Sequence, residues 1–119
     1  MLATPSLDAI FSALADPTRR ALLQRLTSGE ATVLELAEPF ALTLPAISRH
    51  LKVLEKAGLI TRGRDAQMRP CSLRTEALEE VTRWTMNTRS AWEERMDNLA
   101  AHLKQLQAKQ EKPHARKRR

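Results

Sequence analysis

The side chains of this sequence that could do chemistry are basic, and they lie close together. Residues 43–74 contain seven Lys and Arg side chains and only two acidic ones. The flanking segments have the opposite balance, with three basic and five acidic side chains in residues 1–42 and five and seven in residues 75–111. A near-neutral chain with one cationic stretch is typical of a protein face that binds phosphate groups.

Three of these basic residues fall on one side of a predicted helix. Thr43 is a good N-cap residue, Pro45 suits a first helical turn, and Gly58 follows the last apolar residue of the pattern, which predicts a helix over about 43–57. The inner face of this helix is expected to be apolar, with Ile47, Leu51 and Leu54. The outer face is expected to carry Pro45, Ser48, Arg49, Lys52 and Lys56. The helix therefore packs on a core through one side and offers cations on the other.

Residues 31–70 have the form of a helix-turn-helix followed by a hairpin. A short helix over about 33–40 precedes the basic helix, and two strands over about 59–64 and 68–74 follow it around a short polar tip. A helix-turn-helix places its second helix in the major groove of duplex DNA. This order of elements, with its positive charge, predicts a winged helix-turn-helix that binds double-stranded DNA.

Two further helices are predicted ahead of this segment. Ser6 caps one over about 7–15, and Asp16 followed by Pro17 starts another over about 18–27. The fold is therefore expected to be mainly α with a small β-hairpin, a winged helix-turn-helix of about five helices and a two-stranded wing.

The last predicted helix is long. Residues 75–109 contain no Gly or Pro, and a stripe recurs there at steps of three and four residues. The stripe consists of Leu78, Val81, Thr85, Thr88, Trp92, Met96, Leu99, Leu103 and Leu106. A helix of about 34 residues is roughly 50 Å long, more than so small a body can bury, so a partner helix is expected to cover it. Residues 1–110 should form one domain, and the basic tail 111–119 is expected to be disordered.

The composition excludes several classes of protein. Two Phe, two Trp and no Tyr are too few for the stacking platforms of a single-strand binder. Cys71 is the only cysteine, so no intramolecular disulfide or paired-cysteine motif can form. We see no signal peptide, no apolar run long enough to cross a membrane and no catalytic constellation. A cytoplasmic, bacterial-type protein that is not an enzyme is expected.

Three features together carry a family resemblance: DPTRR at residues 16–20, ISRHLKVLEKAGLI at residues 47–60, and the basic wing that follows. With them, the sequence resembles the ArsR-type winged-helix transcriptional regulators over roughly residues 7–100. The resemblance implies a homodimer that binds a palindromic operator and represses transcription. It also implies that the first and last helices form the dimer interface.

The resemblance also implies which residues bind. It makes Thr43–Lys56 the recognition helix and places residues 62–69 in a wing on the flanking DNA backbone. The implied DNA-binding residues are Thr43, Leu44, Pro45, Ser48, Arg49, His50, Lys52, Arg62, Arg64, Gln67 and Arg69. The implied dimer-interface residues are Leu7, Ile10, Phe11, Leu14, Val81, Thr85, Thr88, Trp92, Met96, Leu99 and Leu103.

The chemistry of these side chains agrees with a DNA-binding role. Arg49 can donate two hydrogen bonds to the edge of a guanine, whereas Lys52 and the wing arginines suit phosphates. The family often has Gln at the position of Leu44, which offers only apolar contact, for example to a thymine methyl group. His50 suits a phosphate contact and helix packing equally well.

Metal sensing is not expected. Metal-responsive members of the family place ligands at positions that correspond here to Thr32, Leu34 and Ala37, or on the last helix, where His102 stands alone. We therefore expect no cofactor, and a small-molecule effector is left open. Two alternatives remain: a repressor with an atypical metal site, and a winged helix that binds another protein, which its basic outer face disfavours.

Two other features of the chain have structural interpretations. Arg19 and Arg20 of the DPTRR string are expected to form ion pairs within the chain. Cys71 is expected to be a small, half-buried side chain and not a redox switch, because no resolving cysteine accompanies it.

Overall fold

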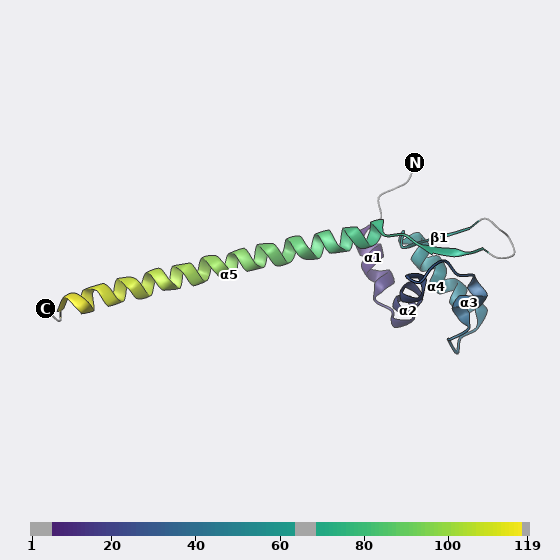
Figure 1. The fold of residues 1–119 in the computed structure, drawn as a ribbon, viewed down its shortest axis with the longest axis horizontal. Coiled ribbons are helices and arrows are strands. Elements are labelled where there is room, and N and C mark those ends of the chain that lie inside the picture. Colours follow the sequence, from purple (N-terminus) through teal and green to yellow (C-terminus); the bar gives the residue numbers. More distant parts are fainter. Residues whose placement is uncertain (1–5, 64–68, 118–119) are drawn as a thin grey trace. The chain divides into compact units, whose positions relative to one another are not determined.

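A computed structural model describes residues 6–63 and 69–117, which form five helices and one two-stranded sheet (Figure 1). The elements are, in order, α1 (Leu7–Leu14), α2 (Pro17–Leu26), α3 (Val33–Ala37), α4 (Leu44–Lys56), β1 (Ile60–Arg62), β2 (Cys71–Leu73) and α5 (Glu76–Lys117). The predicted mainly α fold with a small β-hairpin is confirmed.

The first four helices begin at side-chain caps. Ser6, Asp16 and Thr43 each accept a hydrogen bond from the backbone N–H three residues later, at 3.3, 3.0 and 3.3 Å, as their positions in the sequence predict. Thr32 begins α3 in the same way and forms a capping box with Glu35, whose carboxylate accepts from the Thr32 backbone N–H at 3.0 Å. The first turns of these helices are therefore fixed by their own sequence.

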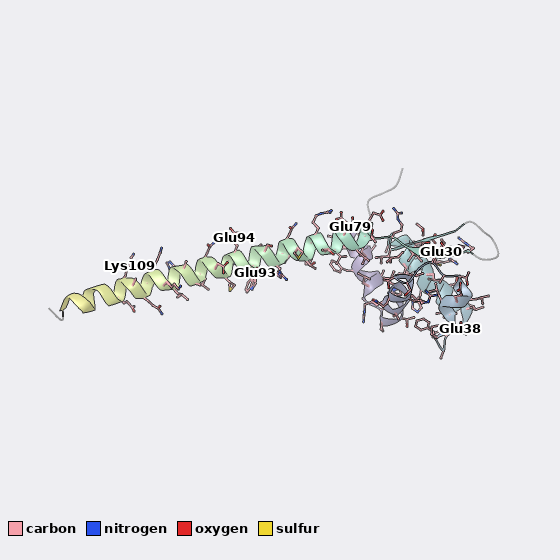
Figure 2. All side chains as sticks on the ribbon, in the orientation of Figure 1. Glu30, Glu38, Glu79, Glu93, Glu94 and Lys109 are labelled. Carbon is pink, nitrogen blue, oxygen red and sulfur yellow. The ribbon has the colours of Figure 1, made fainter. Side chains whose placement is uncertain are left out.

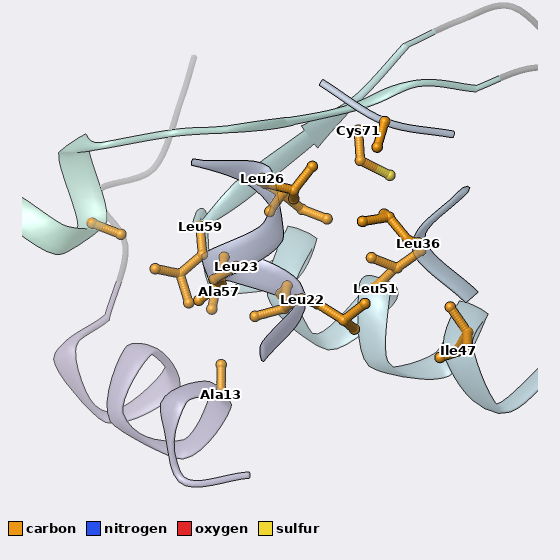
Figure 3. Close-up of a cluster of buried hydrophobic side chains, with 14 of the residues drawn as sticks. Ala13, Leu22, Leu23, Leu26, Leu36, Ile47, Leu51, Ala57, Leu59 and Cys71 are labelled. Carbon is orange, nitrogen blue, oxygen red and sulfur yellow. The ribbon is translucent and has the colours of Figure 1, made fainter. Parts of the chain in front are cut away.

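One apolar core joins α1 to α4 with the hairpin (Figure 3). Leu22 of α2, Leu36 of α3 and Leu51 of α4 are fully buried in it. The predicted inner face of α4 is confirmed, since Ile47 and Leu54 are fully buried as well. The helix-turn-helix is thus held by side chains from every helix around it.

The hairpin is shorter than predicted. Its two antiparallel strands pair Ile60 with Leu73 and Arg62 with Cys71. Pro70 has no N–H to donate, so the ladder ends beside it; Gly63 still donates to the Pro70 carbonyl at 2.7 Å. A Cβ at Gly63 would lie only 2.9 Å from the Pro70 ring, so only glycine fits there.

The corner between α1 and α2 is closed by two arginines. Arg19 donates from Nε to the Ala13 carbonyl at 2.7 Å and from Nη2 to the Ser12 carbonyl at 3.0 Å. Arg20 donates to the Leu14 carbonyl at 2.7 Å. Carbonyls at the end of a helix lack backbone partners within it, and the guanidinium groups bind those of Ala13 and Leu14 in place of the predicted ion pairs. The Ser12 carbonyl also accepts from the Ala15 backbone N–H at 3.2 Å.

The chain divides into two units within α5, at residue 82. The second unit, from residue 83, is a single helix without a core, and side chains such as Glu93, Glu94 and Lys109 project from it (Figure 2). Met96 is half-buried, and the other side chains of residues 83–110 are exposed.

The end of the long helix differs from the prediction. α5 continues to Lys117, so the expectation that the tail is disordered from residue 111 is wrong for residues 111–117. Disorder was expected because the tail lacks apolar residues. Apart from Pro113 and His114, residues 111–117 are nevertheless Glu, Lys, Ala and Arg, which have high helix propensity.

We predict that Arg19→Ala destabilises the first unit. The substitution removes the side-chain donor of the Ala13 carbonyl and one of the two donors of the Ser12 carbonyl, which should cost about 1–3 kcal/mol in the free energy of unfolding. Urea denaturation followed by circular dichroism measures this loss. Arg25→Ala, at an exposed position on the same helix, is the control, and an equal loss in both variants would contradict the role of Arg19.

Candidate nucleic-acid interface

The outer face of α4 is open to solvent at its N-terminal half. Thr43, Leu44 and Pro45 are exposed, and Ser48 is half-buried one turn further on. The side chain of Thr43 is also the N-cap, so its hydroxyl is engaged with the Ala46 N–H at 3.3 Å. The predicted face of the recognition helix is therefore present as a continuous surface.

Arg49 and Lys52 supply the positive charge of this surface. Both side chains are exposed, and neither has an ion pair or hydrogen bond with another described residue. A cation that has no partner within its own chain keeps its hydrogen-bond donors available for an anion.

His50 is turned towards the corner between α1 and α2. Its Nδ1 atom lies 3.3 Å from Arg19 Nη1 and 3.9 Å from Asp16 Oδ2. Of its two predicted uses, the geometry favours helix packing at Nδ1. This contact ties α4 to the corner, a link that no local pattern in the sequence reveals because the residues are about thirty positions apart.

A hollow of about 250 Å³ lies beside the basic face. It is lined by Arg19, Ala46, Arg49, His50 and Val53. The hollow therefore combines a guanidinium from α4 with one from α2. Sequence reasoning missed Arg19 here, since its position next to α4 depends on the packing of α2 against that helix.

The predicted wing residues lie in different environments. Arg69 is exposed and has a φ of 34°, a left-handed conformation that is unfavourable for a residue with a side chain. Arg62 is half-buried at the base of the hairpin, and its Nε is enclosed without a hydrogen-bond partner among the described residues. Arg64 and Gln67 lie outside the residues that the structure describes.

Cys71 is more deeply buried than expected. Its side chain is fully buried beside Arg62. Burial raises the pKa of the thiol, and the positive charge of Arg62 offsets only part of that effect. The thiol therefore stays protonated and unreactive at neutral pH, in agreement with a structural role.

The predicted dimer-interface residues separate into two groups. Ile10 is fully buried in the core of its own chain, so its assignment to the interface is wrong. The predicted apolar stripe on α1 covers two different environments. Ile10 faces the core, whereas Phe11, about 100° further around the helix, is 39% exposed. Leu14 and Val81 pack against the core, and Leu7 is half-buried. The exposed members of the set are Thr85, Thr88, Trp92, Leu99 and Leu103.

The positions where metal-responsive relatives carry ligands have other uses here. Thr32 caps α3, Leu34 is exposed, and Ala37 packs against the core. Within residues 6–63 and 69–117, no three His, Cys, Asp or Glu side chains come together in a way that could hold a metal ion. No helix of the described chain has the length and apolar character needed to cross a membrane.

A helix-turn-helix with a basic outer helix and a two-stranded hairpin behind it defines a winged-helix DNA-binding protein. Comparison with known proteins agrees. A family model described as a helix-turn-helix domain matches residues 14–63. The transcriptional repressor SdpR of Bacillus subtilis is 38% identical over 78 residues, which cover 66% of this chain and 87% of SdpR.

Two further relatives indicate the family. The arsenical resistance operon repressor of Staphylococcus xylosus is 31% identical over 75 residues, which cover 63% of this chain and 72% of that repressor. The crystal structure of the ArsR family transcriptional regulator RHA00566 has a TM-score of 0.71 and 44% identity, covering 73% of this chain and 96% of that chain. The chain belongs to the ArsR family of winged helix-turn-helix transcriptional regulators, a class of regulators and not of enzymes.

We predict that ionisation of Asp16 makes the free energy of unfolding depend on pH in the acid range. The Arg19 backbone N–H, donating to the carboxylate, lowers the pKa of Asp16, and the charges of His50 and Arg19 act in the same direction. A lowered pKa means that the ionised form stabilises the fold above about pH 3.9, the usual value for Asp, and that this contribution is lost as the pH falls through the lowered value.

Asp16→Asn isolates this contribution, because the amide still caps α2 but does not ionise. The difference in unfolding free energy between wild type and variant should shrink as the pH falls from 6 to about 2.5. Urea denaturation at a series of pH values measures it. A difference that stays constant over that range would show that the ionised carboxylate has no such role.

Proposed function

We propose that the protein is a transcriptional repressor that binds a palindromic operator as a homodimer. The observation that carries this proposal is the outer face of α4, where Arg49 and Lys52 are exposed and unengaged by other described residues. The name of SdpR and its extensive similarity support repression over activation. The proposed place of action is the bacterial cytoplasm.

The residues of α4 and the wing differ in which part of the DNA their side chains can bind. We assign base reading to the N-terminal half of α4, where Ser48 and Arg49 can bond to base edges and Leu44 can contact a thymine methyl. We assign phosphate binding to Lys52 and to the wing residue Arg69. The hollow between Arg19 and Arg49 suits a backbone phosphate, since two guanidinium groups border it.

The homodimer is proposed from the surfaces that one chain leaves uncovered. Phe11 on α1 and the apolar stripe on the distal part of α5 are exposed. A two-fold dimer presents two recognition helices to successive major grooves, about 34–36 Å apart, which matches a palindromic operator.

Titration with duplex DNA at several salt concentrations tests the DNA-binding proposal. Affinity for DNA from the region upstream of the gene should fall steeply with salt, because each neutralised phosphate adds about −0.9 to the slope of log affinity against log salt. A slope near zero would contradict the proposal and favour the alternative of a winged helix that binds a protein.

Arg49→Ala tests the assignment of base reading. The variant should lose about 1–3 kcal/mol of binding to the operator and discriminate less between bases at one position of each half-site. Selection of bound duplexes from a random pool measures both effects. Arg25→Ala is the control, and an equal loss on operator and random DNA would make Arg49 a phosphate contact.

A further inference from the structure

An apolar groove lies at the edge of the core in the first unit. It has a volume of about 220 Å³, and four leucines line it, Leu14, Leu23, Leu73 and Leu78. They come from four elements: the end of α1, α2, β2 and the start of α5. Leu23 belongs to the buried core (Figure 3), and the other three are half-buried and pack against that core. The walls of the groove are therefore held in place by the folded unit itself.

Polar side chains border the groove where α2 ends. Arg20, Gln24 and Thr27 complete its lining, and all three are exposed. They follow one another at steps of four and three residues, which places them on one side of the helix. Among the described residues that line the groove, none is acidic. An apolar hollow with a few polar groups on one side is the usual form of a small-molecule site.

The guanidinium group of Arg20 is held beside the groove. Its Nη1 atom donates to the carbonyl oxygen of Leu14, itself a lining residue, at 2.7 Å. Arg20 has no ion pair with another described residue, and its remaining N–H groups have no hydrogen bond to one. A guanidinium that is already positioned loses little conformational freedom when it binds, and its planar fork matches the two oxygens of a carboxylate.

We propose that this groove binds a small monocarboxylic acid, as its anion, with a compact aromatic or branched apolar body. The body lies against the four leucines, and the carboxylate accepts hydrogen bonds from Arg20 and from the amide of Gln24. A cavity of about 150 Å³ holds a benzene molecule, so the groove has room for one six-membered ring. The proposal goes beyond the proposed repressor function and does not rest on it, because the binding is measured without DNA.

Charge distinguishes this ligand from other occupants of the groove. An apolar segment of a second copy laid over it would remove the Arg20 guanidinium from water without a counter-charge, which is unfavourable. A neutral apolar molecule would leave the same donors without an acceptor. A carboxylate supplies both the counter-charge and the acceptor oxygens.

NMR of the full-length protein with labelled leucine methyl groups tests the site, with benzoate as the probe at constant ionic strength. The signals of the four lining leucines should shift together. We expect a dissociation constant of roughly 1 mM, typical of a partly enclosed ligand of about nine non-hydrogen atoms. Leu34 and Leu42, which are exposed but do not line the groove, should not shift. Equal shifts of every exposed leucine would show non-specific adsorption and overturn the inference.

Two related probes separate the charge of the ligand from its apolar body. Benzamide has the same ring without the charge, and it should bind about tenfold more weakly because it makes no charge-assisted hydrogen bonds with Arg20. Acetate has the charge without the ring, and it should cause no shifts at the same concentrations because it buries little apolar surface. Benzamide binding as tightly as benzoate would overturn the assignment to carboxylic acids.

A matched pair of substitutions tests the counter-charge. Arg20→Gln should weaken benzoate binding about tenfold, whereas Arg25→Gln, at an exposed position of α2 outside the groove, should leave the dissociation constant unchanged. Circular dichroism checks that both variants fold, since Arg20→Gln also removes the bond to the Leu14 carbonyl. Equal dissociation constants for the two folded variants would contradict the role of Arg20.

Gln24→Phe tests the groove without removing any bond of Arg20. Because position 24 is exposed at the border of the groove, the added ring can occupy the apolar space, and benzoate binding should be lost. Full benzoate affinity in this variant would overturn the inference. So would failure of benzoate to bind the wild type together with a changed dimer dissociation constant of Gln24→Phe in analytical ultracentrifugation, because a second copy would then cover the groove.

Discussion

The structure of the DNA-reading unit depends on the corner between α1 and α2. Five consecutive residues, DPTRR, supply hydrogen-bond partners for free backbone groups at two helix ends. Asp16 caps the N-terminus of α2, and Arg19 and Arg20 bind the last carbonyls of α1. A negative group at a helix N-terminus and positive groups at a C-terminus are also the charges that the helix dipoles favour. His50 extends this arrangement to α4, because its Nδ1 atom contacts Arg19, so the same group of side chains also holds α4 beside the corner.

This arrangement explains why the recognition face is available. The arginines of α2 hold the corner, and the Glu35 carboxylate is engaged in the capping box of α3. Glu55 is the one acid on α4 itself, and among the described residues no ion pair joins it to Arg49 or Lys52. The positive charge of α4 is therefore left unneutralised near the surface, where it attracts a polyanion.

Much of the fold could be predicted from local sequence, because caps and apolar spacing act over a few residues. The caps at Ser6, Asp16 and Thr43 and the two faces of α4 belong to this class. Contacts between distant residues could not be predicted, such as that of His50 with Arg19 or of Arg62 with Cys71. Ile10 shows the same limit: periodicity gives an apolar face, but only packing decides which part of it meets the core and which part a partner.

One short strand, β2, connects β1 and the residue before α3 to the start of α5. β2 is bonded on one side to β1 and on the other to Ala31, just before α3, through two hydrogen bonds of 2.7 and 3.1 Å. Only Arg74 and Thr75 separate it from α5, and Arg74 is itself bonded to the Leu59 carbonyl at 2.9 Å. This connection is two residues long and one of them is hydrogen-bonded, so β2 and the start of α5 are held close together. The start of α5 is therefore held to the base of the hairpin and to Ala31, the residue that precedes the N-cap of α3.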